Sequence, residues 1–297
     1  MQVQHIDDPA DPRLEPYRSV RDRDTLGRDG HPGRFIGESP LVIEAMLRAP
    51  IRTLSILTAP RHAERAVALV GEAGRADSPD APQVLVAPDA VLDGVVGFHI
   101  HRGFLAVGER PALPTAAELI ARACAGASAG GDAATRAGAL LLCIESCNNI
   151  DNIGQLFRNA AAFGCAGVLL SPDCHDPLYR KSLRVSCGCV LRVPYAWSAD
   201  WEGDLRTLRE THAFALVGAS GGAERTLAEC ARELAERAPA ARRTALLVGA
   251  EYAGLRAPTL AACTHRARIP MAPGVDSLNV AVAAAVFLDR LREAGDA

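Results

Sequence analysis

The chain has 297 residues, of which 49% are hydrophobic, 23% are charged and 4% are aromatic. This length and apolar content suffice for two domains that each bury a core. The formal net charge is −3, which excludes attraction of nucleic acid by an overall positive charge. Any contact with RNA must therefore come from local basic patches.

The first residues lack the basic and then apolar segments of a signal peptide, and no apolar run is long enough to span a membrane. We therefore expect a cytoplasmic protein. The nine cysteines are an odd number and are scattered through apolar segments. This usage is typical of buried reduced thiols rather than of a disulfide framework.

Residues 1–109 are predicted to form a small α/β domain. Its first part, residues 7–34, is rich in Asp, Arg, Gly and Pro and predicts a solvated, partly irregular arm. Apolar runs compatible with alternating strands and helices then occupy residues 41–47, 53–57, 66–70, 83–86 and 104–107. Residues 110–137 are rich in Pro, Ala, Gly and Ser, and we expect a linker there that contains a short helix over 117–125.

Residues 138–297 are predicted to form a second α/β domain. Strand-like runs are found at 139–144, 165–170, 189–195, 213–218, 244–249 and 266–271. Helical patterns alternate with them at 154–163, 201–211, 224–237, 258–263 and 278–293. Such alternation predicts a parallel sheet covered by helices on both faces.

Three segments of this second domain combine a strand end with polar or glycine residues. The run 140–144 leads through Asn149 and residues 152–154 into a helix that carries Arg158. The second segment, 246–255, is a strand that enters a glycine-bearing loop with Glu251. The third, 269–280, is a short strand, a turn and a helix start, for which Asp276-Ser277 is the expected N-cap. Ligands of open α/β sheets bind at such strand ends.

In order and spacing, these segments resemble the signature motifs of the SpoU (TrmH) family of RNA ribose 2'-O-methyltransferases, within the SPOUT superfamily. The resemblance implies a parallel-sheet catalytic domain with a C-terminal trefoil knot, S-adenosylmethionine as the cofactor, and ribosomal or transfer RNA as the partner. Residues 33–39 also resemble the Phe-Ile-x-Glu-Gly entry of the ribosomal-protein-like substrate domains of many members, with Ser39 in place of the usual glycine.

Residue by residue, the resemblance implies two sets of site residues. The catalytic side comprises Arg158, Asn152, Glu251, Ser277 and Asn279. The cofactor is held by Gly249, Ile269, Met271 and Leu278. Because an arginine is normally protonated, Arg158 either becomes a base through desolvation or neighbouring cations, or grips a phosphate and orients the hydroxyl. Simpler interpretations are helix capping for Asn152, Ser277 and Asn279, and bracing of a loop for Glu251.

One departure from the family pattern leaves other functions open. The family commonly has Gly-Asn-Glu-x-x-Gly-Leu in the second motif, whereas Ala250 replaces the asparagine here. This change favours a non-catalytic RNA-binding homologue. A further alternative is a knotted methyltransferase that acts on a base nitrogen, for which a carboxylate base such as Glu251 matters more than Arg158.

The segment 175–189 carries Arg180, Lys181 and Arg184 and is the best local candidate for a patch that contacts RNA phosphates, although a solvated basic turn explains it equally well. Cys174, His175, Cys187 and Cys189 lack the spacing of a zinc site, so we expect no metal. Residues 218–222 follow a strand but lack the spacing of a dinucleotide-binding loop.

The C-terminal helix is apolar almost all round. Such a helix must be buried in a core or against another subunit. We therefore expect a homodimer joined through the helix over 278–291, with each subunit lending groups to the substrate of its neighbour, as the resemblance implies.

Overall fold

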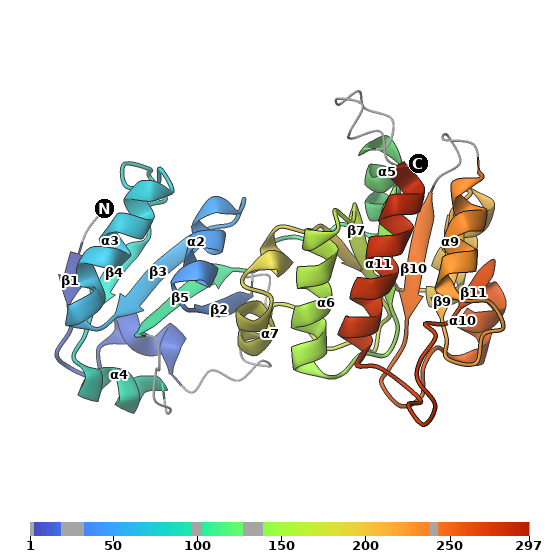
Figure 1. Cartoon of the computed structure of the whole chain (residues 1–297). Coiled ribbons are helices and arrows are strands. Elements are labelled where there is room, and N and C mark those ends of the chain that lie inside the picture. Colours follow the sequence, from blue (N-terminus) through green and yellow to red (C-terminus); the bar gives the residue numbers. More distant parts are fainter. Residues whose placement is uncertain (1–2, 19–32, 97–102, 127–138, 238–242, 297) are drawn as a thin grey trace. The chain divides into compact units, whose positions relative to one another are not determined.

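The computed structural model describes residues 3–18, 33–96, 103–126, 139–237 and 243–296. Contacts within the chain divide it into two units (Figure 1). Unit 1 comprises Met1–Ala112 and Asp176–Arg192, and unit 2 comprises Leu113–His175 and Val193–Ala297. No helix in the described ranges is both long and apolar enough to cross a bilayer.

Unit 1 is built on a five-stranded mixed sheet, which agrees with the predicted α/β domain. The strand order is β1 (Val3–His5), β4 (Gln83–Val86), β3 (Thr53–Thr58), β5 (Phe104–Glu109), β2 (Arg34–Glu38). β1, β4 and β3 are parallel, whereas β5 runs antiparallel to both β3 and β2. The helices that follow the strands are α2 (Pro40–Arg48), α3 (Ala63–Glu72) and α4 (Asp89–Val96).

The predicted arm is wrong at residues 12–17. The 3₁₀-helix η1 (Pro12–Tyr17) there buries Leu14 and Tyr17. The hydroxyl groups of Tyr17 and Ser55 lie 2.7 Å apart. Two apolar side chains, sparse among charged neighbours, therefore fix this segment to the sheet. The remainder of the expected arm, 19–32, lies outside the described residues.

A segment of the predicted second domain belongs to unit 1. Residues 176–192 form α7 (Arg180–Val185) and the 3₁₀-helix η4 (Cys189–Leu191), which pack on β2 and α2. Arg184 donates to the buried carboxylate of Glu38 at 3.2 Å. The boundaries predicted for the second domain therefore need correction at this segment, because its partners are distant in sequence.

Unit 2 contains a six-stranded sheet in which every pair is parallel, which confirms the predicted sheet type. Its strand order is β11 (His265–Ala267), β9 (Ala215–Ala219), β10 (Thr244–Val248), β6 (Leu140–Ile144), β7 (Gly167–Leu170), β8 (Tyr195–Trp197). The strand expected at 189–195 is wrong in position, because Gly188 adopts a left-handed conformation and η4 follows it. The polypeptide becomes extended only at Tyr195.

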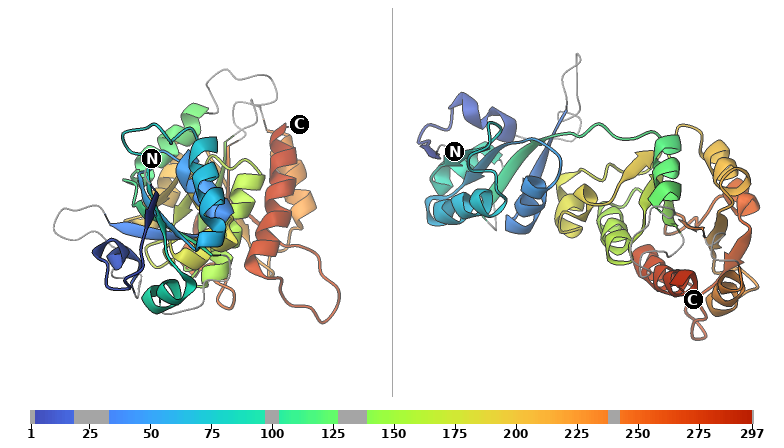
Figure 2. Two further views of the ribbon diagram at one scale, coloured as in Figure 1. Left: turned by 90° about the vertical axis from the view of Figure 1, so that its left-hand side faces the viewer. Right: turned by 90° about the horizontal axis from the view of Figure 1, so that it is seen from above.

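Helices cover both faces of this sheet (Figure 2). One face carries α6 (Ile150–Ala162), α11 (Val280–Asp296) and α9 (Leu227–Ala235). The other carries α5 (Ala116–Gly126), α8 (Trp201–Glu210) and α10 (Ala257–Ala262). α5 is the helix expected within the linker, and it packs against β7 and β8 of unit 2.

Candidate active site

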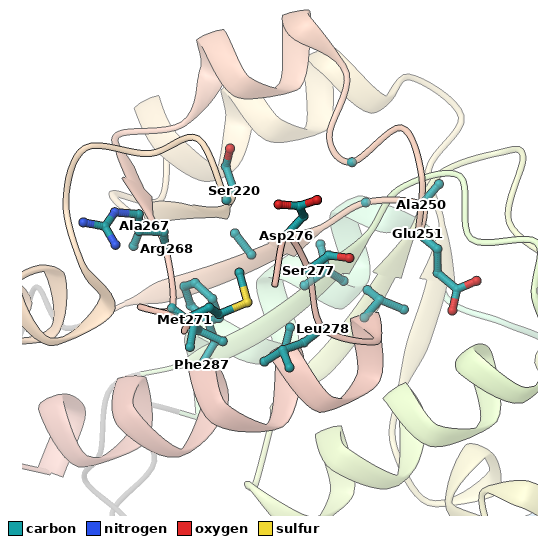
Figure 3. A pocket seen from close by; sticks show the side chains of 18 residues that line it. Ser220, Ala250, Glu251, Ala267, Arg268, Met271, Asp276, Ser277, Leu278 and Phe287 are labelled. Atoms are coloured by element: carbon teal, nitrogen blue, oxygen red, sulfur yellow. The ribbon is translucent and has the colours of Figure 1, made fainter. Parts of the chain in front are cut away.

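A pocket lies at the carboxyl edge of the parallel sheet of unit 2 (Figure 3). The loops after β9, β10 and β11 line it, together with the first turns of α11. The four residues predicted to hold a cofactor, Gly249, Ile269, Met271 and Leu278, all line this pocket, as do the predicted catalytic residues Glu251 and Ser277. Segments that are distant in sequence thus meet because parallel strands end at one edge.

Gly249 allows the loop after β10 to close on itself. A Cβ atom at this position would lie 2.1 Å from the carbonyl oxygen of Gly254. The amide of Gly254 donates to the carbonyl of Ala250 at 2.9 Å, and Gly254 has a φ of +65°, which favours glycine. The family glycines therefore make a tight turn that ends beside the pocket.

The three motif segments are joined by side-chain hydrogen bonds. The amide nitrogen of Asn152 donates to Glu251 Oε1 at 2.7 Å. Asn279 Nδ2 lies 2.9 Å from Asn152 Oδ1 and 3.1 Å from Glu251 Oε1. In Figure 3 the Glu251 side chain points away from Ser220 and Asp276. The carboxylate of Glu251 is thus bound by two amides, and it has no contact with Arg158 among the described atoms.

Two asparagines cap the helices that flank this cluster. Asn149 Oδ1 accepts from the amide of Asp151 at 2.9 Å and caps α6, so Asn152 is free to bind Glu251. Asn279 Oδ1 accepts from the amides of Ala281 and Val282 at the start of α11. The cap expected at Asp276-Ser277 is therefore wrong, because the helix starts three residues later than Ser277.

Glu145, which the three motifs do not predict, anchors the loop from the other side. Its side chain is fully buried at the end of β6 and accepts from the backbone amide of Arg256 at 2.8 Å and from its Nε at 2.9 Å. The hydroxyl group of Thr259 also donates to Glu145, and Trp201 Nε1 donates to Thr259 at 3.0 Å. The sequence does contain a signal for this residue, because an acidic residue directly follows a buried strand at the edge of the sheet where ligands bind.

Arg158 lies on α6, is exposed, and is not among the pocket residues. Within the described part of the chain, its guanidinium group has no hydrogen bond or ion pair. The adjacent Asn159 donates to the carbonyl of Ala281 at 2.7 Å, so α6 and α11 are held together next to it. A free, exposed guanidinium group is available to a phosphate.

The predicted RNA patch lies on α7 in unit 1. Arg184 and Arg180 form ion pairs with Glu38 at 3.2 and 3.8 Å, respectively. Lys181 is partly buried on the same helix. Part of the positive charge of the patch is therefore neutralised by an acid beneath it.

The thiol and carboxyl groups at this edge differ in protonation. Burial raises the pKa of Cys147 to about 12, so this thiol stays protonated and is unsuitable as a nucleophile. Partial burial acts to raise the pKa of Asp173, but hydrogen bonds from Ser146 and Ser171 outweigh it and leave the pKa below its usual value. No group of three or more His, Cys, Asp and Glu side chains in the described ranges is arranged to hold a metal.

Comparison with known sequences identifies the family. The sequence profile described as "SpoU rRNA Methylase family" matches residues 139–289. The chain belongs to this family of RNA methyltransferases. It is 38% identical over 296 residues, covering 98% of this chain and 93% of the relative, to the uncharacterized tRNA/rRNA methyltransferase Mb0905 of Mycobacterium bovis.

Two further relatives extend the comparison. The 23S rRNA (guanosine-2'-O-)-methyltransferase RlmB of Bordetella pertussis is 32% identical over 197 residues, or 66% of this chain and 72% of that protein. The AdoMet-bound rRNA methyltransferase of Sinorhizobium meliloti has a similar fold, with a TM-score of 0.68, 20% identity and 98% coverage of both chains. The fold similarity to this structure thus includes residues of both units of the chain.

Proposed function

We propose that this SpoU protein transfers a methyl group from S-adenosylmethionine to a ribose 2'-hydroxyl of ribosomal or transfer RNA. The observation that carries the proposal is the Asn152–Glu251–Asn279 cluster, which joins all three motif segments at one edge of the pocket. The 2'-O activity named for the RlmB relative supports the same reaction.

The pocket suits an adenosine-containing cofactor. Leu278, Val280 and Phe287 supply apolar surface for a purine, and the adjoining loops expose backbone groups next to Gly249 and Ile269. Arg268, Asp276 and Ser220 add polar side chains for the charged end of the cofactor. When bound, S-adenosylmethionine supplies an electrophilic methyl group on its sulfonium.

The side chains of the chain bind and orient the nucleophile. The 2'-hydroxyl is a weak nucleophile at neutral pH and must be positioned next to a base. Glu251 Oε1 already accepts hydrogen bonds from two side-chain amides, and this engagement favours an orienting role over that of a base for a ring nitrogen. Arg158 binds the ribose or its phosphate.

A homodimer explains the position of Arg158 outside the pocket. Leu278, just before α11, and Val282 and Val286 on α11 form an exposed apolar stripe, with relative exposures of 40%, 50% and 39%. Burying this stripe against a second copy would bring α6 of one subunit toward the site of the other, since α6 packs on α11 and the first turns of α11 line the pocket. Each subunit then lends Arg158 to the substrate of its neighbour.

Several other features follow from the family resemblance. We assign unit 1 to binding of the RNA substrate, with Arg180, Lys181 and Arg184 contacting phosphates. We assign a trefoil knot to the C-terminal segment and place the reaction in the cytoplasm. The non-catalytic alternative is less well supported, because backbone contacts between Ala250 and Gly254 close the turn without the side chain of the usual asparagine.

Calorimetry of the full-length protein with S-adenosylhomocysteine tests the proposal. We expect binding to the wild type and to Gly222→Ala, where a Cβ meets nothing within 4 Å. We expect Gly249→Ala to lose it, since its Cβ would collide with the backbone of Gly254. Absence of binding to the folded wild type at millimolar ligand would contradict the enzymatic function.

A further inference from the structure

Tyr252 is unusual among the tyrosines of the chain. Its relative exposure is 103%, whereas Tyr17 and Tyr195 are buried and make ring or hydroxyl contacts. Tyrosine rings are usually buried on at least one face, because the ring contributes most of the apolar area of the side chain. Among the large hydrophobic side chains that the described residues expose, Tyr252 is the only aromatic one.

The backbone beneath Tyr252 is held on both sides. Before it, Glu251 binds Asn152 and Asn279. After it, Gly254 closes the turn onto Ala250, and Arg256 is fixed to the buried Glu145. The ring is therefore presented to solvent from the tip of a closed turn, with its attachment point fixed.

The position of the turn limits what the ring can contact. Glu251 lines the pocket and Tyr252 does not, so the ring lies outside the lining of the pocket. It is nevertheless one residue from a carboxylate of the site. When the reacting ribose of a substrate lies over the pocket, the neighbouring nucleotides therefore lie close to this ring.

We propose that Tyr252 is a stacking platform for an RNA base next to the methylated ribose. The inference rests on the proposed function. Every nucleobase has a π-face, and aromatic side chains bind unstacked bases of single-stranded RNA in this way. The aromatic ring thus provides a contact to a base. The basic side chains proposed above, in contrast, contact the ribose or the phosphates of the RNA.

A second copy of the chain is the competing occupant, because the apolar stripe on α11 is exposed in the same unit. The stripe is aliphatic and runs along a helix, as helix-to-helix packing requires, whereas Tyr252 is a single ring on a loop. The two surfaces differ in chemistry, and this difference favours a base as the occupant of the ring.

The experiment uses full-length Tyr252→Phe and Tyr252→Leu, which keep the ring and the apolar bulk, respectively. Fluorescence anisotropy measures binding of a labelled single-stranded RNA of about 12 nucleotides, in the presence of S-adenosylhomocysteine. We expect Tyr252→Leu to weaken binding about tenfold, equal to about 1.4 kcal/mol. Tyr252→Phe should stay within about twofold of the wild type. An abasic oligonucleotide of the same length should not distinguish the three proteins.

Other outcomes overturn the inference. Equal RNA affinity for Tyr252→Leu and the wild type, or no affinity of the wild type for the probe, would show that the ring does not bind bases. A shift of Tyr252→Leu to a smaller species in light scattering would assign the ring to an interface between copies. Calorimetry with S-adenosylhomocysteine separates these results from a failure of the proposed function, since Tyr252 does not line the pocket.

Discussion

Arg158 and Ser39 show how single residues matched to a family motif depend on their surroundings. Arg158 keeps its motif position on α6, but it lies outside the pocket and is exposed. Ser39 replaces a family glycine, and the backbone there retains the conformation that favours glycine. We therefore expect substitution of Arg158 to change methyl transfer, and substitution of Ser39 to change the free energy of unfolding.

Replacing Arg158 by Lys should reduce methyl transfer by at least about a hundredfold, because an ammonium group cannot reproduce the planar fork that binds a phosphate through two bonds. Affinity for S-adenosylhomocysteine should change by no more than a few-fold, since Arg158 does not line the pocket. Single-turnover kinetics and calorimetry measure the two effects. Arg206→Lys, on an exposed position of α8, is the matched control. Near-normal turnover of Arg158→Lys would contradict the assigned role.

Ser39→Gly should stabilise the protein. Ser39 is buried, has φ +93° and ψ 151°, and makes no side-chain cap hydrogen bond at the start of α2. A non-glycine residue in this region costs about 1–3 kcal/mol, and the added freedom of the unfolded chain offsets part of the gain. We expect urea denaturation to show a gain of about 1 kcal/mol. Ser39→Ala, which keeps the Cβ, should show none, and a loss of stability in Ser39→Gly would refute this explanation.

At the scale of elements, the loop after β10 depends on the carboxylate of Glu145, which directly follows β6. Glu145→Gln should lower the free energy of unfolding by about 1–3 kcal/mol, because a buried acceptor of three donors loses its charge. It should also weaken S-adenosylhomocysteine binding several-fold, since the loop carries Gly249 and Glu251. Denaturation and calorimetry measure both effects. Glu224→Gln, at an exposed site, is the control, and wild-type cofactor affinity in Glu145→Gln would show that the anchor does not shape the pocket.

The elements also show how far the sequence could predict the structure. Apart from the misplaced strand at 189–195, alternating apolar runs identified the strands of the parallel sheet, and parallel topology then brought the three motifs to one edge. The pattern could not reveal that 176–192 packs with unit 1, because the contact of Arg184 with Glu38 joins residues far apart in sequence. Nor could it decide which asparagine caps a helix, since Asn149, Asn152 and Asn279 all suit an N-cap until their partners are known.

At the scale of the whole molecule, the exposed stripe on α11 predicts association. Val286→Glu should weaken self-association by about 2 kcal/mol or more, because the interface would bury an unpaired charge. Folding should be little affected, since Val286 is 39% exposed within one chain. Leu113→Glu, at a site of 38% exposure, is the matched control. Light scattering over a dilution series measures the effect. A fully active wild-type monomer at micromolar concentration would exclude the dimer.

The identity of the methylated nucleoside tests the central claim most directly. The full-length protein is incubated with isotopically labelled S-adenosylmethionine and with unmodified ribosomal and transfer RNA, and the RNA is digested to nucleosides for mass spectrometry. We predict that the label appears in a 2'-O-methylated nucleoside and that Arg158→Lys abolishes it. Label in a base-methylated nucleoside, or no label in either RNA from a protein that binds the cofactor, would contradict ribose methylation.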